Sequence, residues 1–310
     1  MPKKLRFEDL ESPLIQRRKP GDQFHTVGVI GLGVMGQGIS ETIAGAGIEV
    51  IGVEKNETSL KAGLDGLNKT LDLEIKRWGR TASEKRAVLS RIRGTTSINE
   101  LKDVDIVVEA VDENFELKCR LIDEFYSIGK AKAVYISNTA SLSLTKLAEN
   151  AKYPDQIIGM HFLNPVPSVP LVEIVRGMKT SDATFALVKA FAHRIGKTPV
   201  EVFEYPGFIT TRIVLSLLNE AMHVLMEGIA SANDIDTAMK LGYSMQTGPL
   251  EMADTIGLDE VLAWMEILYR ELGEPRYRPC PLLRRMVRKG KLGKKVGEGF
   301  FTYNEDGKRK

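Results

Sequence analysis

The sequence predicts an α/β fold in two parts: an N-terminal, doubly wound and mostly parallel sheet of the Rossmann type, and an all-helical C-terminal domain. For the first part, a glycine-rich turn lies between a short apolar strand and a helix, and strands then alternate with helices. For the second part, the pattern beyond residue 205 is helical throughout. We therefore expect an N-terminal arm over residues 1–24, the sheet domain over 25–204 and the helical domain over 205–310.

The composition is that of an ordinary globular protein. The 310 residues are 43% hydrophobic and 27% charged with a net charge of +2, which gives no reason to expect nucleic acid as a partner. The two cysteines, Cys119 and Cys280, make neither a disulfide framework nor a metal-ligand cluster. No apolar run reaches the ~18 residues that a membrane span needs, and the charged arm is not a secretory signal. We expect a cytoplasmic protein with no metal and no membrane partner.

The glycine-rich turn predicts a dinucleotide site. It follows a strand expected over Thr26–Ile30, precedes a helix expected over 35–46 and matches G-x-G-x-x-G. The first glycine permits the tight turn, the second lets a pyrophosphate approach the helix N-terminus, and the third allows close packing of helix on strand. This context makes a glycine turn without a ligand a much weaker reading. The residues expected at the cofactor are Gly31, Leu32, Gly33, Val34, Met35 and Gly36.

An acidic residue at the end of the next strand indicates which dinucleotide binds. The strand is expected over 48–53, and Glu54 follows it, 18 positions after Gly36. A carboxylate there accepts hydrogen bonds from the ribose hydroxyls and repels a 2′-phosphate. The sequence therefore favours NAD over NADP, although the neighbouring Lys55 weakens the preference.

The next segment, residues 57–93, is expected to form a helical hairpin because its leucines keep helical spacing. Its many lysines and arginines make a solvated helix face, or a surface for a phosphate-rich ligand. Polar residues then follow two predicted strands at their C-terminal ends, where ligands of a doubly wound sheet bind. They are Glu113 and Lys118 after the strand 106–111, with a helix over 115–128, and Asn138 and Ser141 in the loop 137–142 after the strand 133–136.

One histidine and one glutamate lie in two apolar runs that are close in the sequence. His161 ends the run 157–160 and Glu173 lies inside the run 171–175, and three prolines exclude a helix between them. If the runs are neighbouring strands, the two side chains can meet. A buried carboxylate beside an imidazole fixes its tautomer and stabilises the imidazolium, which makes a general base. A satisfied core histidine beside a glutamate at a strand edge is an equally good reading of these residues alone.

The last part of the chain is expected to be helical. A final strand over Thr198–Phe203 leads to a boundary at 204–207. The segment 213–226 is so apolar that we expect it to be buried on more than one side, by its own domain or by a second subunit. The expected helices are 208–228, 231–241, 248–256 and 258–272.

Taken together, these motifs resemble the L-3-hydroxyacyl-CoA dehydrogenases, including the bacterial 3-hydroxybutyryl-CoA dehydrogenases, over residues 25–304. Several of the matching stretches are more specific than a generic dinucleotide fold. They are Val29-Ile-Gly-Leu-Gly-Val-Met-Gly36, Val107-Val-Glu-Ala110, Gly159-Met-His-Phe-Leu-Asn-Pro-Val-Pro167, Leu171-Val-Glu-Ile174, Pro206-Gly-Phe-Ile209, Asp234-Ile-Asp-Thr-Ala-Met-Lys-Leu-Gly242, Gly248-Pro249 and Gly297-Glu-Gly-Phe300.

The resemblance implies an NAD-dependent oxidation of a 3-hydroxyacyl-CoA to the 3-ketoacyl-CoA, as in β-oxidation, and the reverse reaction. It also implies a homodimer built through the helical domain and a cleft that closes on the acyl-CoA. His161 and Glu173 fall on the family's catalytic pair. The basic residues within 69–93 would face the CoA phosphates. Further residues that the resemblance places around the cofactor are Glu113, Lys118, Asn164 and Lys295, and Asn138 is expected there from its place in the loop 137–142.

The sequence departs from the family pattern at the substrate. Ala140 stands where the family usually has a serine, Thr211 stands where it has an asparagine, and Ser141 is the remaining polar neighbour. Loss of a catalytic hydrogen-bond donor costs about 2.7–4 kcal/mol in the transition state. Two such losses would remove most activity on an ordinary substrate, but Ala140 also leaves more room next to the reacting carbon. The substitutions therefore predict a bulky, branched or cyclic acyl group near C2 or C3. Two alternatives stay open: a weakly active or inactive homologue that binds NAD or acyl-CoA, and a dehydrogenase of a related carrier-bound hydroxyacyl group or a free hydroxy acid.

Overall fold

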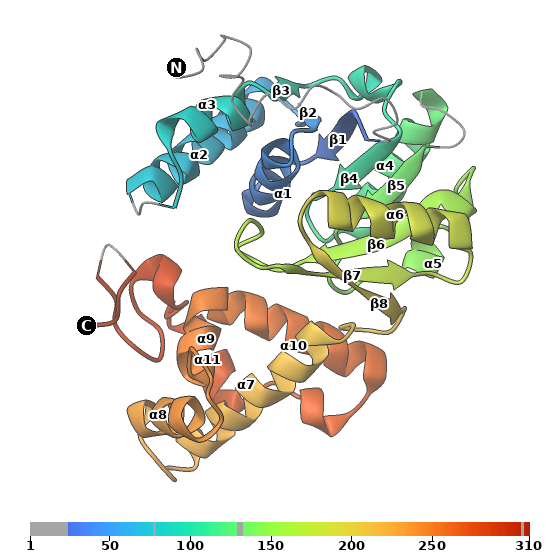
Figure 1. Cartoon of the computed structure of the whole chain (residues 1–310). Coiled ribbons are helices and arrows are strands. Elements are labelled where there is room, and N and C mark those ends of the chain that lie inside the picture. Colours follow the sequence, from blue (N-terminus) through green and yellow to red (C-terminus); the bar gives the residue numbers. More distant parts are fainter. Residues whose placement is uncertain (1–23, 77–78, 129–132, 305–306) are drawn as a thin grey trace, which may run out of the picture.

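The computed structural model describes residues 24–76, 79–128, 133–304 and 307–310. The expected N-terminal arm therefore lies outside the described residues, apart from Phe24. Two lobes make up the described chain (Figure 1): a sheet flanked by helices, and a group of helices that follows it in the sequence. This arrangement confirms the predicted fold class.

The sheet of the described chain has eight strands in the order β3-β2-β1-β4-β5-β6-β7-β8. Neighbouring strands are parallel except for β6 and β7, which are antiparallel. Their bounds are β1 Thr26–Ile30, β2 Glu49–Val53, β3 Ile92–Thr95, β4 Ile106–Glu109, β5 Val134–Ser137, β6 Ile157–Phe162, β7 Leu171–Arg176 and β8 Thr198–Phe203. The C-terminal ends of β1, β2, β4, β5 and β6 consequently meet at one edge, and most of the predicted ligand-binding residues follow these ends, whereas Thr211 and Lys295 lie in the helical lobe.

Helices cover both faces of the sheet because its strands are apolar on both sides. On one face, α1 (Val34–Gly45) and α6 (Asp182–Arg194) bury Ile39 and Phe191 against the strands. On the other face, α4 (Phe115–Ile128) and α5 (Leu144–Leu147) bury Phe125 and Leu144 in a second core. The helix 115–128 is confirmed residue for residue, whereas α6 is not among the predicted elements.

The helical hairpin is shorter than the sequence predicts. Its helices are α2 (Glu57–Lys76) and α3 (Ala82–Leu89), and α2 packs on α1 through buried leucines such as Leu67 and Leu71. Residues 92 and 93, expected to end the hairpin, belong to β3. The reason is tertiary: the short segment Ile92–Thr95 pairs in parallel with β2, which no local helical pattern reveals.

The helical lobe has a hydrophobic core of its own, in which Leu215, Met222, Met265 and Tyr277 are buried. Predicted and observed bounds agree within about two residues, and α11 was not predicted. The helices are α7 Thr210–Met226, α8 Ala232–Gly242, α9 Pro249–Ile256, α10 Leu258–Leu272 and α11 Pro281–Arg288. Among the described residues, none of the helices combines the length and the apolar character that crossing a membrane requires.

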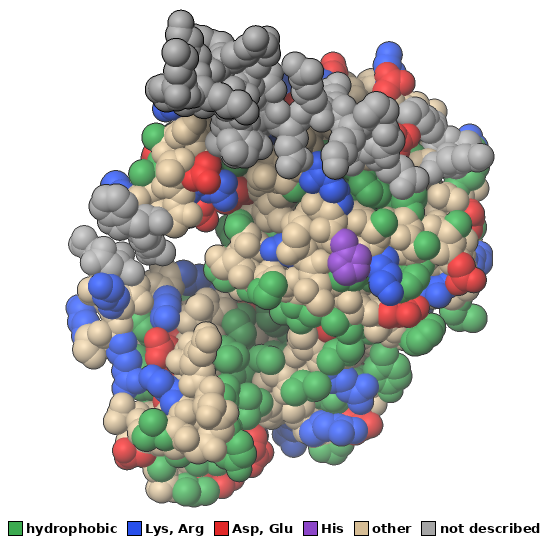
Figure 2. Space-filling view, viewed as in Figure 1, with side chains coloured by type: hydrophobic (Ala, Val, Ile, Leu, Met, Phe, Trp, Pro, Cys, Tyr) green, Lys and Arg blue, Asp and Glu red, His purple; other side chains and the backbone are tan. Residues whose placement is uncertain are grey.

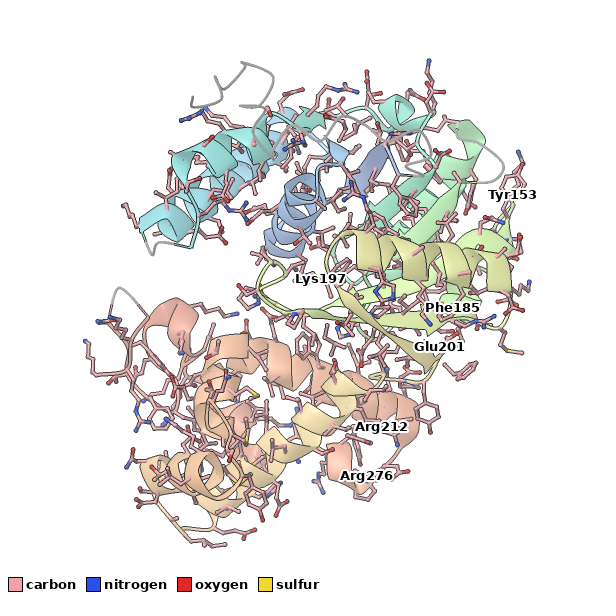
Figure 3. All side chains as sticks on the ribbon, in the orientation of Figure 1. Tyr153, Phe185, Lys197, Glu201, Arg212 and Arg276 are labelled. Carbon is pink, nitrogen blue, oxygen red and sulfur yellow. The ribbon has the colours of Figure 1, made fainter. Side chains whose placement is uncertain are left out.

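The two lobes are joined directly after β8. The carboxylate of Glu204 accepts hydrogen bonds from the amide and the hydroxyl of Thr145. The chain then turns at Gly207 (φ +79°) and Phe208 (φ +48°) into α7. Arg212, at the start of α7, lies over the ring of Tyr205 and donates to the Tyr277 hydroxyl over 2.7 Å. Figure 3 shows Arg212 in the helical lobe, on the same side of the molecule as Glu201 of β8. Figure 2 shows the lobes in contact on the side of β8 and an open notch between them on the side of the hairpin.

Candidate active site

The glycine turn after β1 leaves room for a ligand at one position only. A Cβ on Gly31 would lie 2.7 Å from the Ala110 carbonyl oxygen, and a Cβ on Gly36 would lie 1.8 Å from the Gly31 oxygen. Both glycines are therefore required by the packing of the turn itself. A Cβ on Gly33 would meet no described atom within 4 Å, so the protein's own packing does not require glycine there. The open space at Gly33 fits the close approach of a pyrophosphate.

The start of α1 supports the same interpretation. Gly33 is its N-cap, no side chain of the described residues caps the helix, and its first turn carries no acidic residue. The first amides of a helix lack intrahelical partners, and together with the helix dipole they attract an anion. The turn and the helix start thus suit the phosphates of a dinucleotide.

Glu54 lies beneath the glycine turn, as its position after β2 predicts. One oxygen of its carboxylate accepts the amide of Leu32 over 2.6 Å, and the other accepts the amide of Lys55 over 3.2 Å. The carboxylate is therefore fixed beside the turn and keeps lone pairs for further donors. Contact with a ribose stays a prediction.

His161 and Glu173 are opposite each other in the antiparallel pair β6–β7, and their side chains meet. Nδ1 of His161 is 2.6 Å from Oε2 of Glu173, and the residues are 6% and 1% exposed. The predicted contact is confirmed. A carboxylate on Nδ1 holds the proton of a neutral imidazole there and leaves Nε2 as the proton acceptor. This is the tautomer that a general base needs.

Glu173 has further partners that the sequence analysis missed. Its Oε1 accepts the amides of Ile209 (3.2 Å) and Thr210 (2.8 Å), and its Oε2 accepts the Thr210 hydroxyl (3.1 Å). Burial alone would raise the pKa of Glu173, but the hydrogen bonds from His161 and Thr210 outweigh it and lower that pKa. The ring of Phe208 lies 5.5 Å from that of His161. The start of the helical lobe therefore forms part of the surroundings of the pair.

The loop after β5 is held by Glu113. Its Oε1 accepts the Thr139 hydroxyl (2.6 Å), the amide of Ala140 (3.0 Å), and both the amide and the hydroxyl of Ser141 (2.9 Å each). Burial would raise the pKa of Glu113, but the Lys118 ammonium and these hydrogen bonds hold it below its ordinary value. Since the Ser141 hydroxyl is directed to Glu113, it is not placed to replace the serine missing at Ala140.

A fully buried ion pair supports this loop from below. Nζ of Lys118 is 2.6 Å from Glu109 and 3.5 Å from Glu113. Glu109 also accepts the Ser137 hydroxyl over 2.7 Å and the Val111 amide over 2.9 Å. Lys118 therefore holds two carboxylates at the sheet edge, and its direct contact with a cofactor stays a prediction. Glu109 was missed as a site residue, although it lies inside one of the stretches that match the family.

Asn138 joins the loop to the catalytic strand. Its backbone amide donates to the backbone carbonyl of Glu109 (2.8 Å), and its side-chain oxygen accepts the backbone amide of Phe162 (3.0 Å), next to His161. The structure thus brings Asn138 and His161 to the same edge of the sheet, which also carries the glycine turn and Glu113.

The remaining predicted residues lie farther along the chain. Asn164 is exposed, two residues beyond β6, and Thr211 is 9% exposed in the first turn of α7. Lys295 lies in the helical lobe, in the short helix Lys294–Val296, where its Nζ is 2.6 Å from Asp259. Roles for these three residues at the cofactor or the substrate stay predictions.

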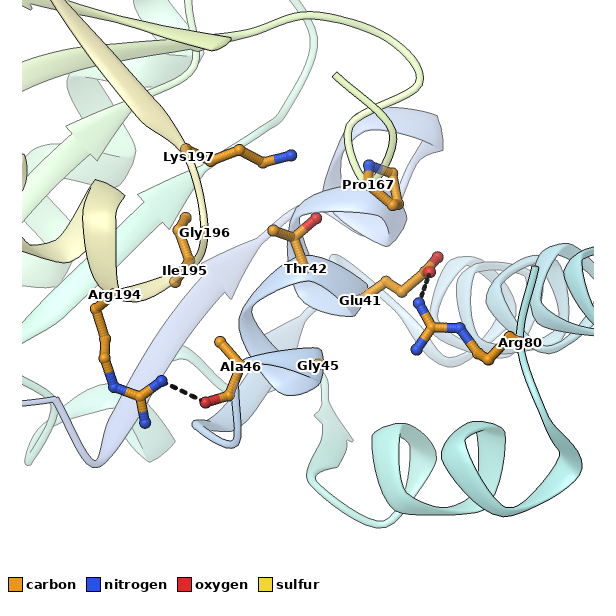
Figure 4. A pocket seen from close by; sticks show the side chains of 10 residues that line it. All are labelled: Glu41, Thr42, Gly45, Ala46, Arg80, Pro167, Arg194, Ile195, Gly196 and Lys197. Atoms are coloured by element: carbon orange, nitrogen blue, oxygen red, sulfur yellow. Dashed lines mark hydrogen bonds and ion pairs between the residues drawn. The ribbon is translucent and has the colours of Figure 1, made fainter. Parts of the chain in front are cut away.

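A hollow of about 430 Å³ lies elsewhere, beside the second half of α1 (Figure 4). Glu41, which is 1% exposed, pairs there with Arg80 over 2.8 Å, and Arg80 also bonds Glu74 over 2.9 Å. This pair ties the hairpin to α1. None of the residues predicted for NAD or catalysis lines the hollow, whereas Arg80 is one of the basic residues within 69–93 that are expected to face the CoA phosphates.

Known proteins share both the sequence and the structure. Residues 26–205 match the family model of the 3-hydroxyacyl-CoA dehydrogenase NAD binding domain, and residues 207–303 match that of the 3-hydroxyacyl-CoA dehydrogenase C-terminal domain. A 3-hydroxybutyryl-CoA dehydrogenase of Bradyrhizobium diazoefficiens is 41% identical over 277 residues, which cover 89% of this chain and 94% of the relative.

Two solved structures are similar over almost the whole described chain. FadB2 of Mycobacterium tuberculosis is 38% identical, with a TM-score of 0.88 over 91% of this chain and 100% of that one. The (S)-3-hydroxybutyryl-CoA dehydrogenase PaaH1 of Ralstonia eutropha is 44% identical, with a TM-score of 0.84 over the same shares. The two family models together span most of the sequence, and the chain therefore belongs to the 3-hydroxyacyl-CoA dehydrogenase family, with the NAD-binding domain of that family at its N-terminal side.

Proposed function

We propose that the protein catalyses the NAD-dependent, reversible oxidation of a 3-hydroxyacyl-CoA to the 3-ketoacyl-CoA, with His161 as the general base. The observation that carries the proposal is the contact of 2.6 Å between His161 Nδ1 and Glu173 at the edge of the sheet that also carries the glycine turn. Family membership and the names of the relatives support the substrate class.

The residues of the site act on the proton of the substrate. Bound nicotinamide supplies the hydride acceptor. His161 accepts the proton of the C3 hydroxyl at Nε2 while the C3–H bond breaks, its electron pair leaves as hydride, and the C3–O bond becomes a carbonyl. The ionised Glu173 stabilises the imidazolium that results, and it does not take the proton itself. In the reverse direction the imidazolium returns the proton to the carbonyl oxygen.

The chain's own residues would hold NAD at the edge of the sheet. The residues from Gly31 to Gly36 would receive the pyrophosphate at the start of α1, and Glu54 would accept from the ribose hydroxyls. We assign Glu113, Lys118, Asn164 and Lys295 to the surroundings of the cofactor on the strength of the family pattern, and Asn138 from its place in the loop after β5. Glu113 and Lys118 act there through the loop 139–141, which their contacts hold in place.

The substrate is proposed to be a short 3-hydroxyacyl-CoA with a branch or a ring near C2 or C3. The relatives' names point to a short acyl group. Ala140 leaves more room than a serine and removes a donor, while the hydroxyl of Thr211 is shorter than an asparagine side chain. The CoA phosphates would be received by basic residues of the hairpin.

The test is NADH formation with straight, branched and cyclic 3-hydroxyacyl-CoAs, for the wild type and for Ala140→Ser. We expect the best kcat/KM with a branched or cyclic substrate, and a gain for the straight substrate in the variant. Full activity of the wild type on 3-hydroxybutyryl-CoA, unchanged in Ala140→Ser, would contradict the substrate proposal. If no member of the panel reacts although NAD binds, the alternatives are a binding protein or a different hydroxyacyl carrier.

We also propose a homodimer through the helical domain. Large apolar side chains are exposed on this domain, among them Ile213 (64%), Ile229 (67%), Leu241 (80%) and Tyr243 (77%). Light scattering behind size exclusion should give twice the mass of the 34.4 kDa chain, and Leu241→Glu should shift it toward the monomer. The free thiols of Cys119 and Cys280 suit a reducing compartment such as the cytoplasm.

A further inference from the structure

We infer that Thr210 is a positioning residue of the proposed reaction, because its hydroxyl shares one oxygen of Glu173 with His161 and limits how strongly that carboxylate stabilises the imidazolium. The inference rests on the proposed function. No resemblance or comparison assigns this role to Thr210, and Thr211 is the neighbour that the family pattern singles out.

The hydrogen bonds to Glu173 divide between its two oxygens. Oε1 accepts the amides of Ile209 and Thr210, which belong to the backbone at the start of α7. Oε2 accepts Nδ1 of His161 over 2.6 Å and the hydroxyl of Thr210 over 3.1 Å. The oxygen that faces the imidazole therefore has a single competing donor among the described residues, and that donor is a side chain that can be replaced.

The hydroxyl and the imidazole compete for the same charge. A hydrogen bond donated to a carboxylate stabilises its ionised form and lowers its basicity. The Thr210 hydroxyl and amide are both among the causes that lower the pKa of Glu173. A less basic Oε2 holds the proton of an imidazolium less strongly, so the Thr210 hydroxyl limits the support that Glu173 gives to the imidazolium of His161.

Few other charged groups face Glu173. Within the described chain, the interactions that shift its pKa come from burial, from His161 and from Thr210. From the turn before α7, the neutral ring of Phe208 faces His161. From α7 itself, Arg212 is directed to Tyr205 and Tyr277. From β8, the residue paired with Glu173 is Val200. The effect of Thr210 is thus not masked by a second ion pair.

The contact also links the lobes. Thr210 is the first residue of α7, it follows the turn at Gly207 and Phe208, and it touches a strand of the sheet. A change in the position of the helical lobe would therefore alter the hydrogen bonding of Oε2 of Glu173, the oxygen that orients His161.

The experiment compares Thr210→Val, which keeps the shape and loses the hydroxyl, with Thr210→Ser, which keeps the hydroxyl. The readout is the pH dependence of kcat/KM for oxidation of 3-hydroxybutyryl-CoA and of the best substrate of the panel. We expect the acid limb of Thr210→Val to move by roughly half a pH unit to higher pH, because the imidazolium is then held more strongly. Thr210→Ser should restore the wild-type limb.

Thr145→Val is the matched control. It also removes a hydroxyl that donates to a carboxylate at the junction of the lobes, that of Glu204, but Glu204 does not bond His161. Its acid limb should stay where the wild type has it. An unshifted limb in Thr210→Val, or an equal shift in Thr145→Val, would overturn the inference.

A measurement without substrate separates this inference from the proposed function. The chain has four histidines, so the imidazole signal of His161 can be assigned by NMR with His161→Gln and followed with pH. Its titration midpoint should be higher in Thr210→Val than in the wild type and Thr210→Ser, and equal midpoints would refute the role of Thr210. If the wild type turns over no substrate, the proposed function fails, while the midpoints still decide about Thr210.

Discussion

Two buried glutamates of this protein, Glu173 beside His161 and Glu41 beside the hairpin, have opposite properties. Each is 1% exposed, and each faces one cationic or potentially cationic partner. Four hydrogen bonds from three residues satisfy Glu173, and its pKa is lowered. Glu41 has Arg80 on one oxygen and, within the described chain, no donor on Oε2. Burial and the neighbouring Glu74 raise the pKa of Glu41 to about 7.

The comparison shows that burial does not decide the charge of a carboxylate, because the number of donors directed at it does. Two of the donors to Glu173 are backbone amides at the start of α7, which the fold holds in place. Such a carboxylate stays ionised at neutral pH, as the partner of a general base must. The pKa of Glu41 instead lies close to neutral pH, so its charge changes in that range. That charge affects how firmly the hairpin is held on α1.

The largest expected effect comes from Glu173→Gln. The amide cannot stabilise an imidazolium as the carboxylate does, so kcat for oxidation should fall by about 10²–10⁴-fold. NADH formation measures the loss, and calorimetry with NAD should show that cofactor binding is kept. Glu41→Gln is the matched control, with the same substitution at the other buried glutamate, and its kcat should stay near that of the wild type. Comparable losses of kcat in Glu173→Gln and Glu41→Gln would contradict the distinction between the two glutamates.

Arg80→Met should have the next largest effect, on stability. Removal of the guanidinium leaves Glu41 and Glu74 near each other without a cation, and loss of one partner of a buried ion pair costs about 3 kcal/mol. The loss should be larger at pH 8 than at pH 6, because a larger part of Glu41 must then carry an unpaired charge or take up a proton. Urea unfolding at the two pH values measures it. A loss that does not depend on pH would mean that Glu41 is not the group affected.

Glu41→Gln should have a smaller effect whose sign follows from linkage. The pKa of Glu41 is raised from 4.5 to about 7 on folding, so the folded state binds more protons between these values and wild-type stability falls as pH rises through them. Glutamine does not titrate, and the variant should gain roughly 2–3 kcal/mol over the wild type between pH 5 and pH 8. Parallel stability curves for the two proteins would show that Glu41 ionises normally.

Much of the site around Glu173 could be predicted from the sequence, but little of the surroundings of Glu41 could be. The glycine turn, Glu54 and the two apolar runs that carry His161 and Glu173 are local patterns, and the structure joins the runs as neighbouring strands. The ion pair of Glu41 and Arg80 joins residues 39 positions apart, one on α1 and one in the connection between α2 and α3, and no spacing rule indicates it.

Contacts that depend on how elements dock were missed for the same reason. Thr210 reaches Glu173 only because the turn at Gly207 and Phe208 aims the start of α7 at β7. The strand β3 has a weakly apolar sequence and is fixed by its pairing with β2. Glu109 looks like an ordinary strand residue until its pair with the buried Lys118 is seen.

The central claim, that His161 is the base of an NAD-dependent dehydrogenase, is tested most directly by His161→Gln. NADH formation from NAD and the best 3-hydroxyacyl-CoA would be measured beside calorimetry of NAD binding. The account predicts that turnover falls by about 10²–10⁴-fold while the affinity for NAD is unchanged. Turnover close to that of the wild type, with NAD bound equally well, would contradict the account.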